Sequence, residues 1–196
     1  MRDSIVDRSF ELSIDDQKTL LRLARTTIES GAQSGTATPV NVNDYPASLA
    51  VLASSFVTLH KNDQLRGCIG SLSPTQALVS DVAEHAYAAA FRDPRFPAVT
   101  EDEVPALHIE ISVLTPQQPI DCSSEEDLLN QLNANQDGLT IEDGHYHATF
   151  LPSVWAQLPD KREFLAQLKR KAGLSSDHWS HHFKAYRYHT LSFAED

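Results

Sequence analysis

The sequence predicts an α+β fold in which a mostly antiparallel sheet is flanked by helices. Two hairpin signals support this class, one where the polar segment KNDQ (61–64) separates two β-like runs and one at Asp143-Gly144. Residues 106–116, ALHIEISVLTP, alternate apolar and polar side chains, as a half-buried strand does. Helical segments occur without the regular βαβ repeat of a parallel sheet. We therefore expect one domain over residues 1–196, long enough to form two closely packed lobes.

Two helices are predicted in the first half of the chain. Segment 12–31 has Ser13 as its N-cap, apolar residues at helical spacing and Gly31 as its C-cap. A second helix is expected to begin at Ser73-Pro74 and to stop at Asp93-Pro94, because the residue before a proline avoids the α region.

The second half of the chain is predicted to contain two more helices, a hairpin and a final strand. Ser124 caps a helix with an acidic first turn, and Asp160 caps another that ends at Gly173. Asp143-Gly144, between two strand-like runs, is the signal that predicts the hairpin. Residues 181–193, HHFKAYRYHTLSF, are predicted to return as one strand.

The composition argues against several classes of partner. The chain has 196 residues and a net charge of −11, and it lacks a run of Lys or Arg that would match a phosphate backbone. We therefore expect no nucleic-acid partner. The N-terminus, MRDSIVDRSF, lacks the apolar core of a signal peptide, and no stretch approaches the roughly 20 apolar residues of a membrane span. These features predict a cytoplasmic protein with no membrane partner, in which Cys68 and Cys122 are separate thiols.

Two clusters of charged or histidine side chains are interpreted as solvated surface. In DHWSHH, His178 and His182 would share a helix face as zinc ligands do, but the segment follows a glycine-capped helix and precedes a strand. We expect no metal there. A basic patch on the helix that begins at Asp160 is interpreted as the solvated face of an amphipathic helix. The patch comprises Lys161, Arg162, Lys169, Arg170 and Lys171.

The segment LRGCIG (65–70), the second strand of the first hairpin, is the strongest candidate for chemistry. Period two places Arg66, Cys68 and Gly70 on one face, so the guanidinium and the thiol are expected to be neighbours. A cation beside sulfur favours the thiolate, which is the nucleophilic form. Strand glycines such as Gly67 and Gly70 indicate that a ligand or another backbone approaches closely. The alternative is that Cys68 is a small core residue.

Glu110 and Ser112 lie on the polar face of the strand that the alternation predicts. A glutamate in the middle of a core strand is costly unless it is paired. We therefore expect Glu110 to bind Arg66 or Arg95, or to line a polar pocket. Beside Cys68, such a carboxylate could do acid–base work or help to hold an anionic ligand. A buried structural ion pair is the alternative.

Several motifs occur in an order that is specific for one family. They are LRGCIGSL, DPRFPAV, IEISVLTP, GLTIEDGHYHATFLPSVW and FLAQLKRKAGL, the last followed by Trp179. In these motifs nearly the whole chain resembles the AMMECR domain family, whose prokaryotic members are called AmmeMemoRadiSam system protein A. The resemblance implies an α+β fold with a main lobe and a smaller lobe, and a cleft near the cysteine strand. It also implies work beside a Memo-like protein, which resembles non-haem-iron extradiol dioxygenases, and beside a radical S-adenosylmethionine enzyme.

The family motif assigns a candidate site residue by residue. Our leading hypothesis is a small enzyme or catalytic partner subunit in which Cys68 reacts and Arg66 favours its thiolate. Glu110 would act as the acid–base group, and Arg95 would hold an anionic part of the ligand. The other motif positions expected at the ligand are Gly67, Gly70, Asp93, Phe96 and Ser112. The alternative is a non-catalytic adaptor that binds a protein or a ligand at the same place. The family name brings no established activity or cofactor.

Overall fold

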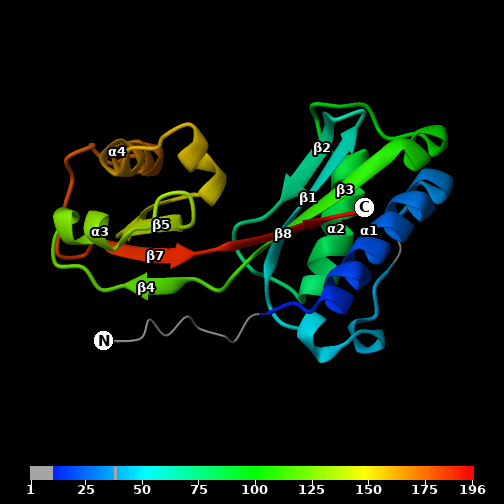
Figure 1. Cartoon of the computed structure of the whole chain (residues 1–196), viewed down its shortest axis with the longest axis horizontal. Helices are drawn as coiled ribbons and strands as arrows, with labels where there is room; N and C mark the ends of the chain where they lie inside the picture. Colours follow the sequence, from blue (N-terminus) through cyan, green and yellow to red (C-terminus); the bar gives the residue numbers. More distant parts are fainter. Residues whose placement is uncertain (1–10, 38) are drawn as a thin grey trace. The chain divides into compact units, whose positions relative to one another are not determined.

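The computed structural model describes residues 11–37 and 39–196, which form two compact units. Unit 1 contains the described residues up to Leu114 together with Leu191–Asp196, and unit 2 is Thr115–Thr190. Each unit has one four-stranded sheet and its own helices (Figure 1). The α+β class that the sequence predicts is thus confirmed.

Unit 1 is a sheet with the strand order β2-β1-β3-β8, packed against two helices. Its core lies on the helix side of the sheet, where Val57, Leu59, Ile109 and Ile111 are completely buried. The strands are β1 (Ser54–Lys61), β2 (Gln64–Gly70), β3 (Leu107–Leu114) and β8 (Thr190–Ala194), and the helices are α1 (Ile14–Ser34) and α2 (Leu78–Phe91). Short 3-10 helices cover Val42–Asp44 (η1), Ala47–Leu49 (η2) and Glu101–Ala106 (η3).

Helix α1 begins where the sequence predicts and ends later. Ser13 is the N-cap, and its side chain accepts a hydrogen bond from the N–H of Asp16 while the Asp16 carboxylate accepts from Ser13 in return. The helix continues past Gly31 and ends at Gly35, which has a φ of 71°. Gly31 instead gives the ring of Phe91 room, because a Cβ there would lie 2.5 Å from the ring. The predicted C-cap was therefore wrong by one turn.

Helix α2 begins later than predicted, at Leu78. The N–H of Leu78 donates to the carbonyl oxygen of Val51, and Leu52 and Ala77 form an isolated β-bridge. These contacts hold the segment after Pro74 in an extended conformation, so the N-terminal signals there do not start a helix. The helix ends at Phe91, just before Asp93-Pro94, as expected.

The first hairpin is tighter than its polar segment predicts. Strands β1 and β2 are joined by Asn62 and Asp63, and both residues have positive φ, at 52° and 60°. Asn and Asp tolerate this left-handed conformation, which a two-residue hairpin turn requires.

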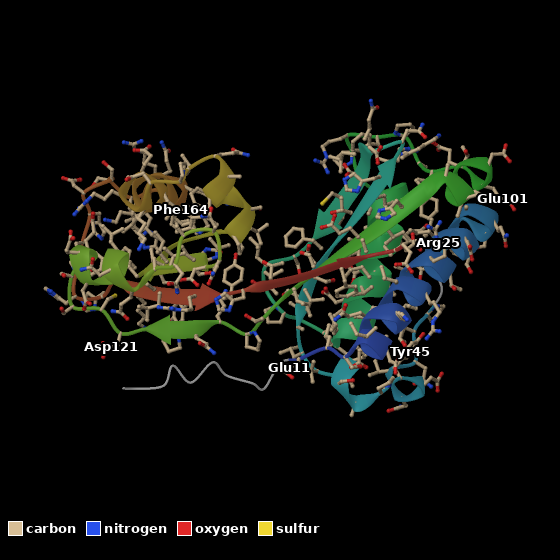
Figure 2. The ribbon with its side chains drawn as sticks, viewed as in Figure 1. Glu11, Arg25, Tyr45, Glu101, Asp121 and Phe164 are labelled. Carbon is tan, nitrogen blue, oxygen red and sulfur yellow. The ribbon has the colours of Figure 1, made fainter. Side chains whose placement is uncertain are left out.

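Unit 2 is a sheet with the strand order β4-β7-β5-β6 and a separate core. Trp155 and Phe164 stack in this core with ring centroids 3.7 Å apart, and Figure 2 labels Phe164 on helix α4. The strands are β4 (Gln118–Ile120), β5 (Gly138–Asp143), β6 (Tyr146–Phe150) and β7 (Lys184–Tyr188). The helices are α3 (Glu125–Gln131), α4 (Lys161–Ala172) and the 3-10 helix η4 (Pro152–Ala156). The caps at Ser124, Asp160 and Gly173 are confirmed. The second hairpin is confirmed as well, but its two turn residues are Gly144 and His145, because Asp143 pairs with Tyr146.

The predicted final strand over 181–193 is two strands in two sheets. Strand β7 pairs with β5 in unit 2, and β8 ends the sheet of unit 1. His189 separates them, and its backbone N–H donates to the side chain of Thr115. Period-two alternation carries no signal for a change of sheet, which is why the sequence indicates one strand.

The last residues of unit 1 are fastened to α1. Arg25 of α1, labelled in Figure 2, donates to Glu195 at 3.0 Å and to the carbonyl oxygens of Val104 and Leu107 at 2.7 and 2.8 Å. The N–H of Glu195 in turn donates to the carbonyl oxygen of Ile109.

Among the described residues, no helix has the length and apolar character needed to span a membrane.

Candidate functional site

Three side chains form a row across the sheet of unit 1. Thr58 of β1 pairs with Cys68 of β2 on one side and with Glu110 of β3 on the other. Because Val57 and Leu59 face the helices, the alternation of β1 places Thr58 and its two partners on the face that α1 and α2 do not cover. The hydroxyl of Thr58 donates to the Sγ of Cys68 at 3.3 Å. Cys68 is half-buried, so it is neither a core residue nor a fully exposed one.

The DPRF motif fixes the backbone of Cys68. The buried carboxylate of Asp93 accepts from the N–H of Cys68 at 2.9 Å, and Arg95 donates to the Cys68 carbonyl oxygen at 3.0 Å. Arg95 and Asp93 are themselves joined by a salt bridge of 2.7 Å. Since β2 is an edge strand, these two side chains replace the neighbouring strand that Cys68 lacks.

We call Asp93 and Arg95, which hold the backbone of Cys68, the clamp. Their pKa values follow from their contacts. The guanidinium of Arg95 holds the pKa of Asp93 well below its usual range, and the N–H of Cys68 lowers it further. Asp93 in turn raises the pKa of Arg95. The side chain of Arg95 is 53% exposed and lies over the ring of Phe96, with its guanidinium carbon 5.5 Å from the ring centroid. Arg95 therefore has donors left for an anionic ligand beside Cys68.

The guanidinium of Arg66 forms an ion pair with Glu103 and does not bind the thiol. A β-bulge between Leu59 and His60 interrupts the pairing of β1 with β2, so simple alternation cannot place Arg66 on the face of Cys68. Its guanidinium binds Glu103 of η3 at 2.9 Å, and Lys61 binds the same carboxylate at 2.8 Å. Arg66, followed by Lys61, lowers the pKa of Glu103 to about 2. The Nη1 of Arg66 is buried and has no hydrogen-bond partner in the described part of the chain.

The two glycines of the motif allow close approach by protein atoms. A Cβ on Gly67 would lie 2.2 Å from the carbonyl oxygen of Ala89, so Gly67 is buried against α2, away from the face of Cys68. A Cβ on Gly70 would lie 2.3 Å from the ring of Phe56. Of the two explanations that the sequence left open, another part of the chain accounts for both positions.

Glu110 and Ser112 lie on the same face as Cys68 but in different contacts. Within residues 11–37 and 39–196, Glu110 forms no ion pair, so neither expected arginine binds it. It is half-buried and remains available beside Thr58. The hydroxyl of Ser112 lies 2.8 Å from that of Ser192 on β8.

The clusters that the sequence assigned to solvated surface are largely used within unit 2. Lys169 is completely buried, binds Glu125 and lies 5.7 Å from the ring centroid of Trp179, which corrects its assignment to a solvated face. His178 binds Asp143 at 2.6 Å, and Ser180 donates to the same carboxylate. The described residues contain no group of three or more potential metal ligands.

The structure shows contacts of several residues that the sequence did not predict. Thr58 and Glu103 lie in segments without a motif, and only the strand register and the bulge reveal their contacts. Asp137 and His189 also form a pair of 3.0 Å across 52 positions of sequence. The register of the first hairpin could have placed Thr58 opposite Cys68, whereas no sequence signal predicts the others.

The comparisons with known proteins identify the family of the chain. The family model AMMECR1 matches residues 21–193, which include the Cys68 row and the clamp. The chain belongs to the AMMECR1 family. A relative from Methanothermobacter thermautotrophicus is 36% identical over 187 residues, covering 94% of this chain and 97% of its own. Protein MJ0810 of Methanocaldococcus jannaschii is 35% identical over 188 residues, covering 94% and 92%.

A solved structure shares the fold. The crystal structure of the uncharacterized protein PH0010 from Pyrococcus horikoshii is 36% identical to this chain and matches with a TM-score of 0.73. The match covers 91% of this chain and 90% of that one. The α+β architecture of this AMMECR1 chain is therefore found in an experimental structure.

Proposed function

We propose that this AMMECR1 protein carries out a thiol-dependent reaction at Cys68, on the face of the unit 1 sheet that α1 and α2 do not cover. The observation that carries the proposal is the row of Cys68, Thr58 and Glu110, with the Thr58 hydroxyl 3.3 Å from the sulfur. A half-buried thiol beside a hydroxyl donor and a carboxylate without an ion pair has the composition of a nucleophilic site.

Each residue of the row and the clamp has a distinct role in this proposal. Cys68 is the nucleophile, and Thr58 orients its sulfur. Glu110 is the acid–base group, since its half-buried carboxylate lies across Thr58 from the thiol. Arg95 holds an anionic part of the substrate through the donors that Asp93 leaves free. Arg66 has no direct role at the thiol in this proposal, because its guanidinium binds Glu103.

We also propose the setting in which this reaction takes place. Membership of the AMMECR1 family supports a role beside a Memo-like protein and a radical S-adenosylmethionine enzyme, in the cytoplasm. In that setting the protein is a catalytic partner subunit rather than an isolated enzyme.

The alkylation of Cys68 by iodoacetamide tests the proposal. The parent is Cys122→Ser, so that mass spectrometry counts adducts at Cys68 alone, and the rate is followed from pH 6 to pH 9 around the free-thiol value of about 8.5. We expect labelling of the native protein and a rate that changes at least about threefold in Thr58→Val, which removes the donor and keeps the shape. Thr75→Ala, an exposed change outside the row, should leave the rate unaltered.

A non-catalytic adaptor is the second candidate, and the clamp is the observation that favours it. Asp93 and Arg95 both bind the backbone of Cys68, so the motif can serve the strand itself rather than a reaction. If Cys68 is labelled only after unfolding, the thiol has no reactive role and the adaptor replaces the enzyme. If Thr58→Val and Thr75→Ala behave alike, the row does not control the sulfur.

A further inference from the structure

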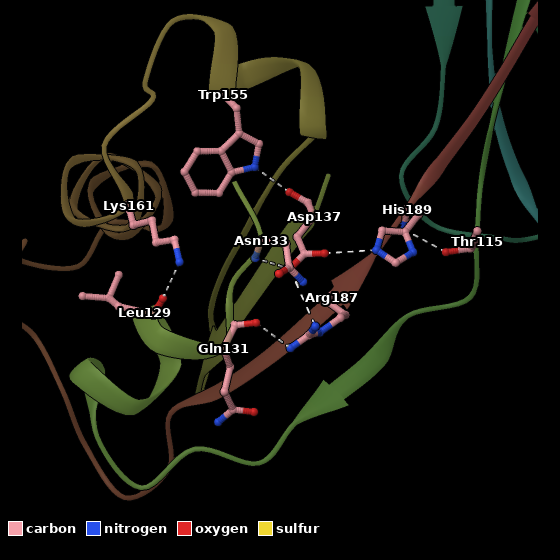
Figure 3. Close-up of polar contacts among 9 residues, drawn as sticks. All are labelled: Thr115, Leu129, Gln131, Asn133, Asp137, Trp155, Lys161, Arg187 and His189. Atoms are coloured by element: carbon pink, nitrogen blue, oxygen red, sulfur yellow. Dashed lines mark hydrogen bonds and ion pairs between the residues drawn. The ribbon is translucent and has the colours of Figure 1, made fainter. Parts of the chain in front are cut away.

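Unit 2 contains a completely buried carboxylate in a rigid frame. The Oδ2 of Asp137 accepts from the backbone N–H of Asn133 at 2.8 Å, and the carbonyl oxygen of Asp137 accepts from the indole N–H of Trp155 at 2.8 Å (Figure 3). Asp137 is 0% exposed, and Trp155 is fixed by its stacking on Phe164. A buried aspartate whose side chain and backbone are both hydrogen-bonded keeps one orientation toward any further partner.

The further partner is an accessible imidazole. The Nε2 of His189 lies 3.0 Å from the Oδ1 of Asp137, while the His189 side chain is 49% exposed (Figure 3). The backbone of His189 is held by two hydrogen bonds to Thr115, of 2.8 and 2.9 Å. An imidazole whose Nε2–H is bound by a carboxylate carries its lone pair on Nδ1, and this atom has no hydrogen-bond partner among the described residues.

Besides His189, the charged side chain that faces Asp137 is Arg187. Arg187 of β7 approaches the other carboxylate oxygen at 3.8 Å and donates to the carbonyl oxygen of Gln131 at 3.0 Å. Asp137 and Arg187 are the charged groups bonded or paired within this cluster, and they balance each other. Arg187 therefore compensates the charge of the buried carboxylate, which stays in contact with the Nε2 side of His189 while a reacting proton is transferred at Nδ1.

We propose that His189 is a proton-transfer group and that Asp137 is its positioning residue. The pair takes a proton at Nδ1 from a hydroxyl, thiol or water that attacks an electrophilic carbonyl, as the buried aspartate of a catalytic triad supports its histidine. This site lies in unit 2 and does not include Cys68. The proposal is therefore independent of the one for the thiol.

A second histidine–carboxylate pair in the same unit provides a matched control. His178 binds Asp143 at 2.6 Å, but Ser180 donates to the same oxygen and the carboxylate is partly exposed. The serine and the solvent weaken the hold of Asp143 on its imidazole. His178 is therefore expected to contribute little to proton transfer.

The test uses p-nitrophenyl acetate as the probe, with the double variant Cys68→Ser, Cys122→Ser as the parent so that no thiol reacts. Nδ1 of His189 accepts a proton from a water molecule as its oxygen attacks the ester carbonyl. The bond between the acyl carbon and the phenolic oxygen breaks, which releases acetic acid and p-nitrophenolate. The acetic acid and the imidazolium then each lose a proton to solvent. Release of the phenol product, counted as p-nitrophenol and p-nitrophenolate together, is followed from pH 5 to pH 9.

We expect His189→Gln to lower the protein-dependent rate by at least about tenfold, below the 10²–10⁴ of optimised acid–base groups because the probe is unspecific. His178→Gln should retain the parent rate. Asp137→Asn should lower the rate and alter the pH profile, because an amide does not stabilise the imidazolium. Equal rates for His189→Gln and the parent, or equal losses in the two histidine variants, would overturn the proposal. In His189→Gln the side-chain amide can still donate to Asp137, so this variant decides the matter even if Asp137→Asn fails to fold.

Discussion

At the scale of single residues, Glu103 shows how the RGCIG motif stabilises unit 1. Its carboxylate is shared by Arg66 and Lys61, and the side chain of Arg66 is only 11% exposed. Removing the carboxylate leaves a nearly buried guanidinium with fewer partners than the unfolded chain would offer it in water. Such a loss is costly because hydrogen bonds to charged groups contribute more than neutral ones.

We expect Glu103→Gln to lower the free energy of unfolding by about 2 kcal/mol at pH 7, as measured by urea titration. The folded-state pKa of Glu103 is about 2, below the ordinary value of 4.5. Because the pKa is lower in the folded state, the ionised carboxylate stabilises the fold at pH values above its unfolded-state pKa. This contribution is lost as the pH falls from about 4.5 to about 2. The difference between wild type and variant should therefore shrink steadily over that interval.

The exposed neighbour Asp102 in the same 3-10 helix provides the control. Asp102→Asn should change the free energy of unfolding by less than about 0.5 kcal/mol. A gap between wild type and Glu103→Gln that stays constant from pH 7 to pH 2 would show that the ion pair is not its source.

At the scale of elements, the DPRF segment completes the edge of β2. The buried Asp93 accepts the outward-facing N–H of Cys68, which on a bare edge would point to solvent or to another chain. The pKa of Asp93 is held well below its usual range, chiefly by Arg95, so the carboxylate remains ionised and able to accept throughout the neutral range.

We expect Asp93→Ala to speed amide hydrogen exchange in the β2 peptide by at least about tenfold, because the N–H of Cys68 loses its acceptor. Exchange in β3, which pairs with β1 and does not contact this carboxylate, should change little. Mass spectrometry of proteolytic peptides measures both segments in one experiment. Uniform acceleration across β1, β2 and β3 would mean that Asp93 supports the whole unit rather than one edge.

Local sequence signals predicted most elements and failed where distant contacts decide. The caps at Ser13, Ser124 and Asp160 are local hydrogen bonds, so their residues alone predict the helix starts. Helix α2 begins late because Val51, far away in the sequence, binds its first turn. The single predicted strand over 181–193 is divided between two sheets, which no local pattern encodes.

The candidate site was predictable to a similar degree. The motif identified Cys68 and the DPRF segment, and the structure brings them together through the backbone of Cys68. It did not predict that Arg66 turns to Glu103, because a β-bulge shifts the alternation by one residue. The contact between Thr58 and the sulfur depends on the hairpin register, which in turn depends on the two-residue turn at Asn62 and Asp63.

At the scale of the whole molecule, the two cores are separate clusters of buried side chains. One contains Ile111 and belongs to unit 1, and the other contains Leu168 and belongs to unit 2. Both tryptophans of the chain, Trp155 and Trp179, lie in unit 2. Tryptophan emission therefore reports the unfolding of unit 2, whereas far-UV circular dichroism reports the helices and strands of both units.

We expect Leu168→Ala and Ile111→Ala to act on different transitions in urea. Both side chains are completely buried, so each truncation should destabilise its own unit by about 2–5 kcal/mol. Leu168→Ala should move the midpoint seen by tryptophan emission to lower urea. Ile111→Ala should move the circular-dichroism transition while the emission midpoint stays near its wild-type value, because none of the buried side chains that the structure describes belongs to both clusters. If Ile111→Ala shifts both signals equally, the units unfold as one cooperative body and the separation of the cores has no thermodynamic consequence.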